Sequence, residues 1–248
     1  MEGFEAVIVF MVVGFIAQMV DGALGMAYGV SSTTFLLSMG IPPAVASASV
    51  HTAEIFVSGV SGLSHLRFGN VDKKLFKKLL IPGVVGGVLG AYVLTALPGE
   101  KMKLFVASYL LIMGLMVLRK AFKKTREKAA KTRLLPLGLV GGFCDAIGGG
   151  GWGPIVTSTL VARGHNPRFT VGSVNLAEFF VTTAEVATFS ATIGLTYWQV
   201  VVGLIAGGVI AAPLAAYVCK RLPTRILMTM VGAAIVALSV RTIYLALF

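Results

Sequence analysis

The two halves of this sequence repeat each other, and this duplication limits the folds that the chain can adopt. A shift of 124 residues, half of the 248 given, aligns residues 14–57 with residues 138–181 without a gap, and 14 of the 44 aligned positions are identical. The clearest match pairs SVHTAEIFV (49–57) with SVNLAEFFV (173–181). We therefore expect a tandem duplication, in which both halves fold into the same set of elements.

The composition places these elements in a membrane. Hydrophobic residues make up 56% of the chain and charged residues only 12%, whereas soluble domains carry about 25% charged residues. An apolar stretch of about 20 residues can cross a bilayer as a helix. The predicted apolar segments are 4–39, 43–65, 76–97, 102–119, 134–162, 169–193, 198–219 and 225–247. The sequence therefore predicts an all-α polytopic membrane protein.

One apolar segment in each half is interrupted shortly after an aspartate. The breaks are expected near Asp21–Gly25 and near Asp145–Gly151, where four glycines are consecutive. Each glycine inside a helix costs about 1 kcal/mol relative to alanine. Unwound backbone at membrane depth is tolerated only where it is buried in protein or lines a wet cavity, and the free N–H groups at a helix start attract anions. We therefore predict one anion site built from both breaks.

The basic residues indicate how the segments cross the membrane. Eighteen of the 21 Lys and Arg lie in 67–78, 119–133, 163–168 and 220–225, and basic loops are typically cytoplasmic. All four loops fall on one side only if each broken segment enters and returns on the same side, as a re-entrant hairpin or as two short crossings. Each half then crosses an odd number of times, so the second half is inverted relative to the first. Inverted-topology repeats with discontinuous helices are a recurrent plan among transporters.

This reading divides the chain into three parts. Residues 1–118 form an N-terminal transmembrane repeat, 119–133 a basic cytoplasmic linker, and 134–248 a C-terminal transmembrane repeat. We expect a multi-pass protein of the cell inner (cytoplasmic) membrane with its N-terminus outside. The formal net charge of +11 is then a topology signal, and no nucleic-acid partner is expected. Cys144 and Cys219 lack metal-ligand spacing, and no metal or cofactor is predicted.

Acidic residues inside the apolar segments are candidates for function. Asp21, Glu54, Asp145 and Glu178, which pair across the repeat, are predicted to take part in proton coupling, because intramembrane carboxyl groups are rare and usually functional. For the two aspartates an equal alternative is that they bind free backbone N–H groups at the breaks. Glu185 has no counterpart, since position 61 is serine, and is expected to be a local hydrogen-bond partner.

A second group of residues is expected to contact the anion. His51 and Asn175 occupy the same repeat position, three residues before the paired glutamates, and both can donate hydrogen bonds; equally, they could satisfy unwound backbone. Tyr28 and Trp152 are predicted as walls of the site. The predicted substrate-binding residues are Gly25, Tyr28, Gly29, Ser31, His51, Gly149, Gly150, Gly151, Trp152, Gly153 and Asn175. The glycines of 83–90 and 203–208 are expected to serve close helix packing instead.

Several motifs carry a resemblance to a known family. The pattern Asp-x3-Gly-x3-Gly occurs at Asp21 and again at Asp145, and Gly-x2-Pro turns begin at Gly40 and Gly164. With the repeated Ala-Glu pair and the basic central loop, the whole chain resembles the TauE/SafE family of sulfite exporters and organosulfur anion permeases. The resemblance implies transport of a small sulfur oxyanion, such as sulfite, or of a sulfonate.

The function expected is therefore a secondary transporter for a small anion, working by alternating access and a candidate for proton coupling. Its predicted partners are the anionic substrate and the lipid bilayer, and a homodimer is left open. One alternative is a passive anion channel, although fixed carboxylates would repel an anion unless protonated, which favours a carrier. The other is an intramembrane aspartyl protease using Asp21 and Asp145, but neither follows a Gly-x-Gly sequence. No enzyme activity is predicted.

Overall fold

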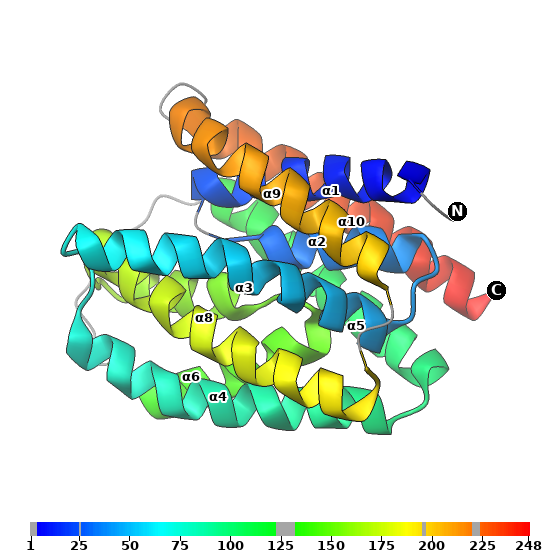
Figure 1. Cartoon of the computed structure of the whole chain (residues 1–248), viewed down its shortest axis with the longest axis horizontal. Coiled ribbons are helices and arrows are strands. Elements are labelled where there is room, and N and C mark those ends of the chain that lie inside the picture. The colour runs from blue at the N-terminus through cyan, green and yellow to red at the C-terminus, as the bar shows by residue number, and fades with distance from the viewer. Residues whose placement is uncertain (1–3, 25, 123–131, 195–196, 220–223) are drawn as a thin grey trace.

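The computed structural model describes residues 4–24, 26–122, 132–194, 197–219 and 224–248. Within these residues the chain is helical and contains no β-strand (Figure 1). In chain order the elements are α1 (Phe4–Leu24), α2 (Tyr28–Ser38), α3 (Pro43–Arg67), α4 (Lys73–Ala96), α5 (Gly99–Phe122), α6 (Leu134–Gly148), the π-helical turn η1 (Gly153–Thr157), α7 (Ser158–Ala162), α8 (Pro167–Thr192), α9 (Trp198–Cys219) and α10 (Thr224–Leu247). These bounds confirm the predicted apolar segments to within a few residues. Of the predicted linker, 123–131 lies outside the described residues.

Both predicted helix breaks are confirmed. The first separates α1 from α2, and Ala27 just before α2 has a φ of 114°, a value that L-residues with a side chain rarely adopt. The second separates α6 from η1, with Gly149 at φ 63° and Gly150 at φ 142°. Only glycine adopts the latter conformation readily, so the consecutive glycines allow the chain to leave α6 and turn sharply.

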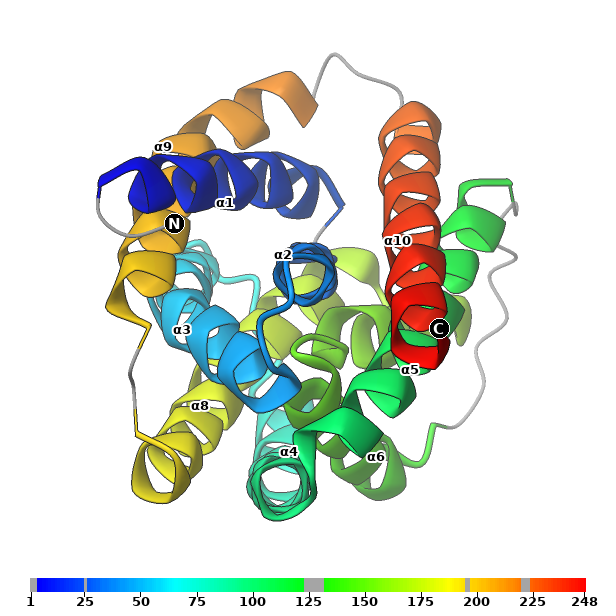
Figure 2. The ribbon, with the colours of Figure 1, turned by 90° about the vertical axis from the view of Figure 1, so that its right-hand side faces the viewer.

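Each of the main helix pairings joins one half of the chain to the other. Helix α1 packs along α9, and α6, its counterpart by the 124-residue shift, packs along α4, the counterpart of α9. Likewise α3 packs along α8, and α5 packs along α10. Viewed along the bundle, α2 lies near the centre, within reach of α1, α3, α5 and α10 (Figure 2).

The two ends of the first broken segment lie at the same end of the bundle. Both chain termini lie at one end (Figure 1), and the Arg241 guanidinium there donates to the Ser38 carbonyl at the end of α2, so α1 begins and α2 ends at this same end. At the other end, the turn before α4 meets the start of α8, where the Asp72 N–H donates to the Ser173 hydroxyl at 2.8 Å and Arg168 donates to Asn70.

Glycines bring the paired helices into close contact, as expected for those outside the breaks. A Cβ atom on Gly90 of α4 would lie 2.5 Å from the Phe143 carbonyl oxygen on α6, and one on Gly14 of α1 would lie 2.5 Å from the Leu204 carbonyl oxygen on α9. Gly203 and Gly207 of α9 pack in the same way against α1. Small residues that let backbones approach are typical of helix packing in membranes.

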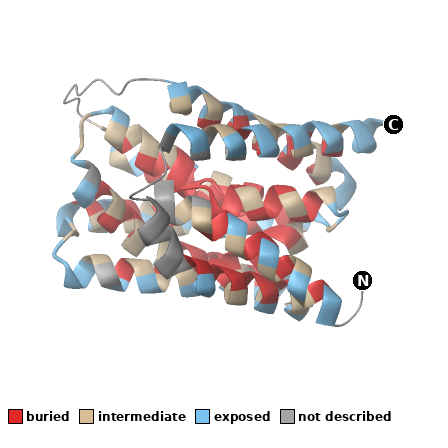
Figure 3. Ribbon diagram, turned by 90° about the horizontal axis from the view of Figure 1, so that it is seen from above, coloured by how far each residue is buried: buried red, intermediate tan, exposed pale blue. Residues whose placement is uncertain are grey.

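Many large apolar side chains are exposed on the exterior of the bundle, while a group of polar side chains is buried inside it. Helix α5 exposes Phe105, Ile112 and Leu115 by 50–56%, and α4 exposes Ile81 by 70%, whereas buried residues concentrate between the helix layers (Figure 3). Helices α4 and α5 are each long and apolar enough to cross a bilayer, and α1, α6, α9 and α10 contain shorter apolar stretches. Such a surface suits a lipid environment.

Candidate functional site

The two helix breaks meet around a small cavity inside the bundle. Its volume is about 10 Å³, roughly enough for one water molecule. The lining residues are Asp21, Met26, Ala27, Gly29, Val30, Glu54, Asp145, Gly150, Gly151, Gly153, Pro154, Asn175 and Glu178. The backbones of the two breaks touch here, since a Cβ atom on Gly29 would lie 2.6 Å from Gly150 Cα. The fold thus brings most of the predicted site residues to one place.

Each aspartate binds the backbone of its own break. The Tyr28 N–H donates to Asp21 Oδ1 at 3.3 Å, and the Trp152 N–H donates to Asp145 Oδ1 at 2.8 Å. Both bonds span seven residues and occupy equivalent repeat positions. They correspond to the backbone-binding alternative for these aspartates, while their part in proton coupling stays a prediction.

Backbone N–H groups are available at the start of α2. The first hydrogen bond within this helix runs from Ser31 N–H to the Ala27 carbonyl, so the N–H groups of Gly29 and Val30 precede it and have no partner within the helix. Both residues line the cavity. A helix start of this kind favours an anion, because its N–H groups carry the positive end of the helix dipole.

The second break is held in place by hydroxyl groups from other helices. Thr33 on α2 donates to the Gly149 carbonyl at 2.5 Å, Ser47 on α3 donates to the Ala146 carbonyl at 2.5 Å, and Tyr109 on α5 donates to the Gly150 carbonyl at 3.2 Å. These bonds satisfy carbonyl groups that the break frees. Ser47 and Tyr109 belong to no motif, so nothing in the sequence indicated their role.

The two aromatic residues predicted as walls lie outside the cavity lining. Tyr28 and Trp152 are buried. The Tyr28 hydroxyl donates to the Leu204 carbonyl on α9 at 3.2 Å, and Trp152 Nε1 donates to the Val174 carbonyl on α8 at 3.2 Å. Their positions are equivalent in the repeat, and each ring anchors its break to a helix of the surrounding bundle.

His51 also lies outside the cavity lining, in a cluster of carboxylates. Its Nε2 atom lies 2.6 Å from Glu185 Oε2 and 3.8 Å from Asp145 Oδ2, and its Nδ1 atom lies 3.7 Å from Glu54 Oε2. Ligand atoms of His51, Asp145 and Glu185 fall within 4.8 Å of one another, so the group could hold a cation. Sequence spacing predicted no metal site, because these residues come from three separate helices.

Three other predicted site residues are not among the described residues that line the cavity. Ser31 lines a lateral cavity of about 360 Å³, otherwise mostly apolar, between α1, α2 and α10. Gly25 lies outside the described residues. Gly149 contacts Thr33 on α2.

Lys120 is a functional candidate that the sequence did not indicate. It was assigned to the basic linker, but it lies in the last turn of α5 and is half-buried. Its Nζ atom lies 2.9 Å from the Ser158 hydroxyl and 3.2 Å from Met26 Sδ. Because Met26 lines the cavity, the ammonium group brings a positive charge next to the site.

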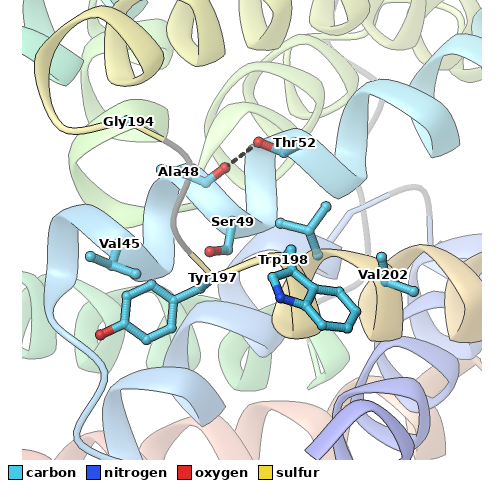
Figure 4. Close-up of a pocket in the computed structure, with 9 residues that line it drawn as sticks. Val45, Ala48, Ser49, Thr52, Gly194, Tyr197, Trp198 and Val202 are labelled. Carbon is cyan, nitrogen blue, oxygen red and sulfur yellow. Dashed lines mark hydrogen bonds between the residues drawn. The ribbon is translucent and has the colours of Figure 1, made fainter. Parts of the chain in front are cut away.

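A further pocket lies between α3 and the start of α9 (Figure 4). Its volume is about 190 Å³, and Val45, Tyr197 and Trp198 are among its lining residues. The Thr52 hydroxyl at its rim donates to the Ala48 carbonyl at 2.6 Å, as the dashed line in Figure 4 marks. No charged side chain is among the described residues that line it.

Comparison with known proteins identifies the family of the chain. The chain is 43% identical over 249 aligned residues to the probable membrane transporter protein YtnM of Bacillus subtilis (strain 168), covering 96% of this chain and 83% of that protein. It is 31% identical over 104 residues to the probable membrane transporter protein ORF9 of Sinorhizobium sp, covering 42% and 40%. No solved structure matches the chain. The family model described as sulfite exporter TauE/SafE matches residues 10–242. The chain therefore belongs to the TauE/SafE family and is a membrane transporter.

Proposed function

We propose that this transporter moves a small sulfur-containing anion, of the sulfite or organosulfonate class, across the cytoplasmic membrane by alternating access. The observation that carries the proposal is the meeting of the two broken helices at one cavity. Gly29 and Gly150, from opposite halves of the chain, touch there, and Gly29 and Val30 at the start of α2 line the same space.

The chemistry of the cavity suits an oxyanion. The N–H groups of Gly29 and Val30 and the amide of Asn175 are hydrogen-bond donors, and the oxygens of a sulfite or sulfonate group accept several such bonds at once. Lys120 adds a positive charge beside Met26. Asp21, Glu54, Asp145 and Glu178 also line the cavity, and an anion beside them requires that protons neutralise part of their charge.

Alternating access is supported by how the halves are arranged. The 124-residue shift converts the pairing of α1 with α9 into the pairing of α6 with α4. This relation is expected for two inverted repeats that begin with re-entrant hairpins and move against each other during transport. The cavity of about 10 Å³ holds roughly one water, which is less than a sulfur oxyanion needs. The two breaks must therefore separate for the anion to bind.

The narrow cavity also favours a carrier over a passive channel. A carrier saturates as its site fills, whereas conduction through an open pore does not. Because the family and the relatives are transporters, we infer that the chain is not an enzyme, and we do not retain the aspartyl protease alternative.

The proposal is tested with purified protein and a panel of anions. Sulfite, thiosulfate, sulfoacetate and methanesulfonate are expected to raise the melting temperature, while chloride and acetate at equal ionic strength leave it unchanged. Uptake of the binding anion into proteoliposomes should then saturate with concentration. Equal shifts with all anions, or flux that rises linearly without saturation, would contradict the proposed transport.

A further inference from the structure

A histidine and a glutamate are buried together behind the cavity. His51 on α3 and Glu185 on α8 are both 0% exposed, and Nε2 and Oε2 lie 2.6 Å apart. The Phe189 ring contacts the imidazole edge-on, with centroids 6.3 Å apart, and Gly87 on α4 leaves room for the carboxyl group, since a Cβ there would lie 2.5 Å from Glu185 Oε1. Three helices thus hold the pair in place.

The polar atoms of this pair are unsatisfied. Although His51 Nε2 and Glu185 Oε2 are close, their geometry is not that of an aligned hydrogen bond, and among the described residues neither imidazole nitrogen and neither Glu185 oxygen has a hydrogen-bond partner. Glu54 Oε2 and Asp145 Oδ2, which face the same imidazole, also lack one. Buried ionised groups without partners are strongly unfavourable, so the cluster requires a cation.

The spacing indicates a proton as that cation. A zinc-type ion binds ligands at about 2.0–2.2 Å with near-tetrahedral angles, which places two ligand atoms about 3.4 Å apart. His51 Nε2 and Glu185 Oε2, at 2.6 Å, are too close for this arrangement. Their separation is near the length of a charge-assisted hydrogen bond, about 2.7–2.9 Å, so one proton could be shared after a small rotation of either group.

The repeat supplies a counterpart that cannot titrate in the physiological range. The 124-residue shift relates His51 to Asn175 and Ser61 to Glu185, and the Asn175 amide donates to the Ser61 hydroxyl at 2.8 Å. Both pairs join α3 to α8 at equivalent positions. In one copy the contact is a neutral hydrogen bond, whereas in the other it is a histidine and a carboxyl group.

We propose that His51 and Glu185 bind the single coupling proton of this transporter, and that Asn175 and Ser61 are the non-titrating counterpart of that site. This inference rests on the proposed anion transport. The pair takes up one proton from water, holds it between Nε2 and Oε2, and returns it to water on the other side. The N–H or O–H bond that forms on uptake breaks again on release, and no other covalent bond changes.

Asp145 and Glu54 connect the pair to the cavity. Both line the cavity and both face the imidazole, at 3.8 and 3.7 Å. A proton on the pair removes one negative charge from this neighbourhood, so anion binding and proton binding favour each other, and the coupling is reciprocal. Two further titratable groups, Glu178 on α8 and Asp21 on α1, line the same cavity as Asp145 and Glu54.

The test is the double variant H51N/E185S, which gives both copies of the pair the same neutral chemistry. The probe is labelled methanesulfonate, because its own charge does not change over the pH range of the assay. In proteoliposomes that are acidic outside, the wild type should accumulate the probe up to about tenfold per pH unit if one proton moves with each anion. The double variant should lose this accumulation yet still exchange labelled for unlabelled probe.

A matched control and a milder variant accompany it. Thr183→Ala removes an exposed hydroxyl from α8, the helix that carries Glu185, and should accumulate the probe as the wild type does. Glu185→Gln keeps the size of the side chain and should also lose accumulation of the probe. It replaces the double variant in the test if the double variant proves unstable. Accumulation that persists in both Glu185 variants would overturn the proposal, as would a loss of exchange in folded protein, since the pair would then serve the anion itself.

A direct measurement separates this site from the proposed function. Infrared difference spectra on acidification should show a protonation band for Glu185 or His51 in the wild type that is missing from H51N/E185S. If the wild type carries no sulfur anion, the transport proposal fails while this spectrum still reports the proton site. If the band is unchanged by the double substitution, the proton site is wrong whatever is transported.

Discussion

At the scale of single residues, Lys120 is the cation whose position bears most directly on the site. Its ammonium group contacts Met26 and Ser158. Lys120→Gln should weaken anion binding about tenfold, equivalent to about 1.4 kcal/mol, while Lys120→Arg should retain most of it. Binding isotherms for the anion identified by the thermal-shift panel provide the measurement. Lys101→Gln, an exposed residue in the first turn of α5, is the control, and an equal loss there would show a nonspecific effect of surface charge.

The sequence predicted the residues of the site better than their partners. The repeat indicated Asp21, Asp145 and both paired glutamates, because identical positions in two copies are visible without a structure. It could not indicate that Glu185 meets His51, since the two belong to different halves and only the packing of α3 on α8 brings them together. Position 61, the counterpart of Glu185, is serine in the sequence. In the fold its hydroxyl accepts a hydrogen bond from Asn175.

At the scale of elements, the contact between the two breaks depends on the absence of side chains. Gly29→Ala would place a methyl group 2.6 Å from Gly150 Cα, and overpacking of this kind costs about 1–3 kcal/mol. We expect lower thermal stability and a large loss of transport, measured on purified protein and in proteoliposomes. Gly99→Ala, in the first turn of α5 with no atom near its Cβ position, should behave as the wild type. Transport that survives in the Gly29 variant would argue against a site at this contact.

The lengths of the apolar segments and the positions of the glycines predicted where the helices begin and end. They did not predict the backbone geometry at the breaks. The run Gly148–Gly151 predicted where α6 ends, because glycine is the poorest helix former after proline. Nothing in the sequence showed that the chain would resume as a π-helical turn at Gly153, where Pro154 lacks the N–H that a regular helix uses. In the first copy Val30 stands in place of Pro154, and α2 begins as a regular helix.

At the scale of the whole molecule, the distribution of basic loops predicts one orientation. In a variant without Cys144 and Cys219, a cysteine at Glu100 should react with a membrane-impermeant maleimide added to intact cells. A cysteine at Thr125, in the predicted cytoplasmic linker, should react only after the membrane is permeabilised. The reverse pattern would place the basic loops outside and contradict the predicted topology.

The size of the closed cavity also bears on how fast the protein can work. An anion enters only after the contact between Gly29 and Gly150 opens, so every measured affinity includes the free energy of that opening. If the receptive form makes up about one molecule in a hundred, the apparent Kd is about a hundredfold weaker than the intrinsic one. Variants whose substitutions keep the cavity open should therefore bind the anion more tightly and transport it more slowly. Variants selected for affinity alone would be the poorest carriers.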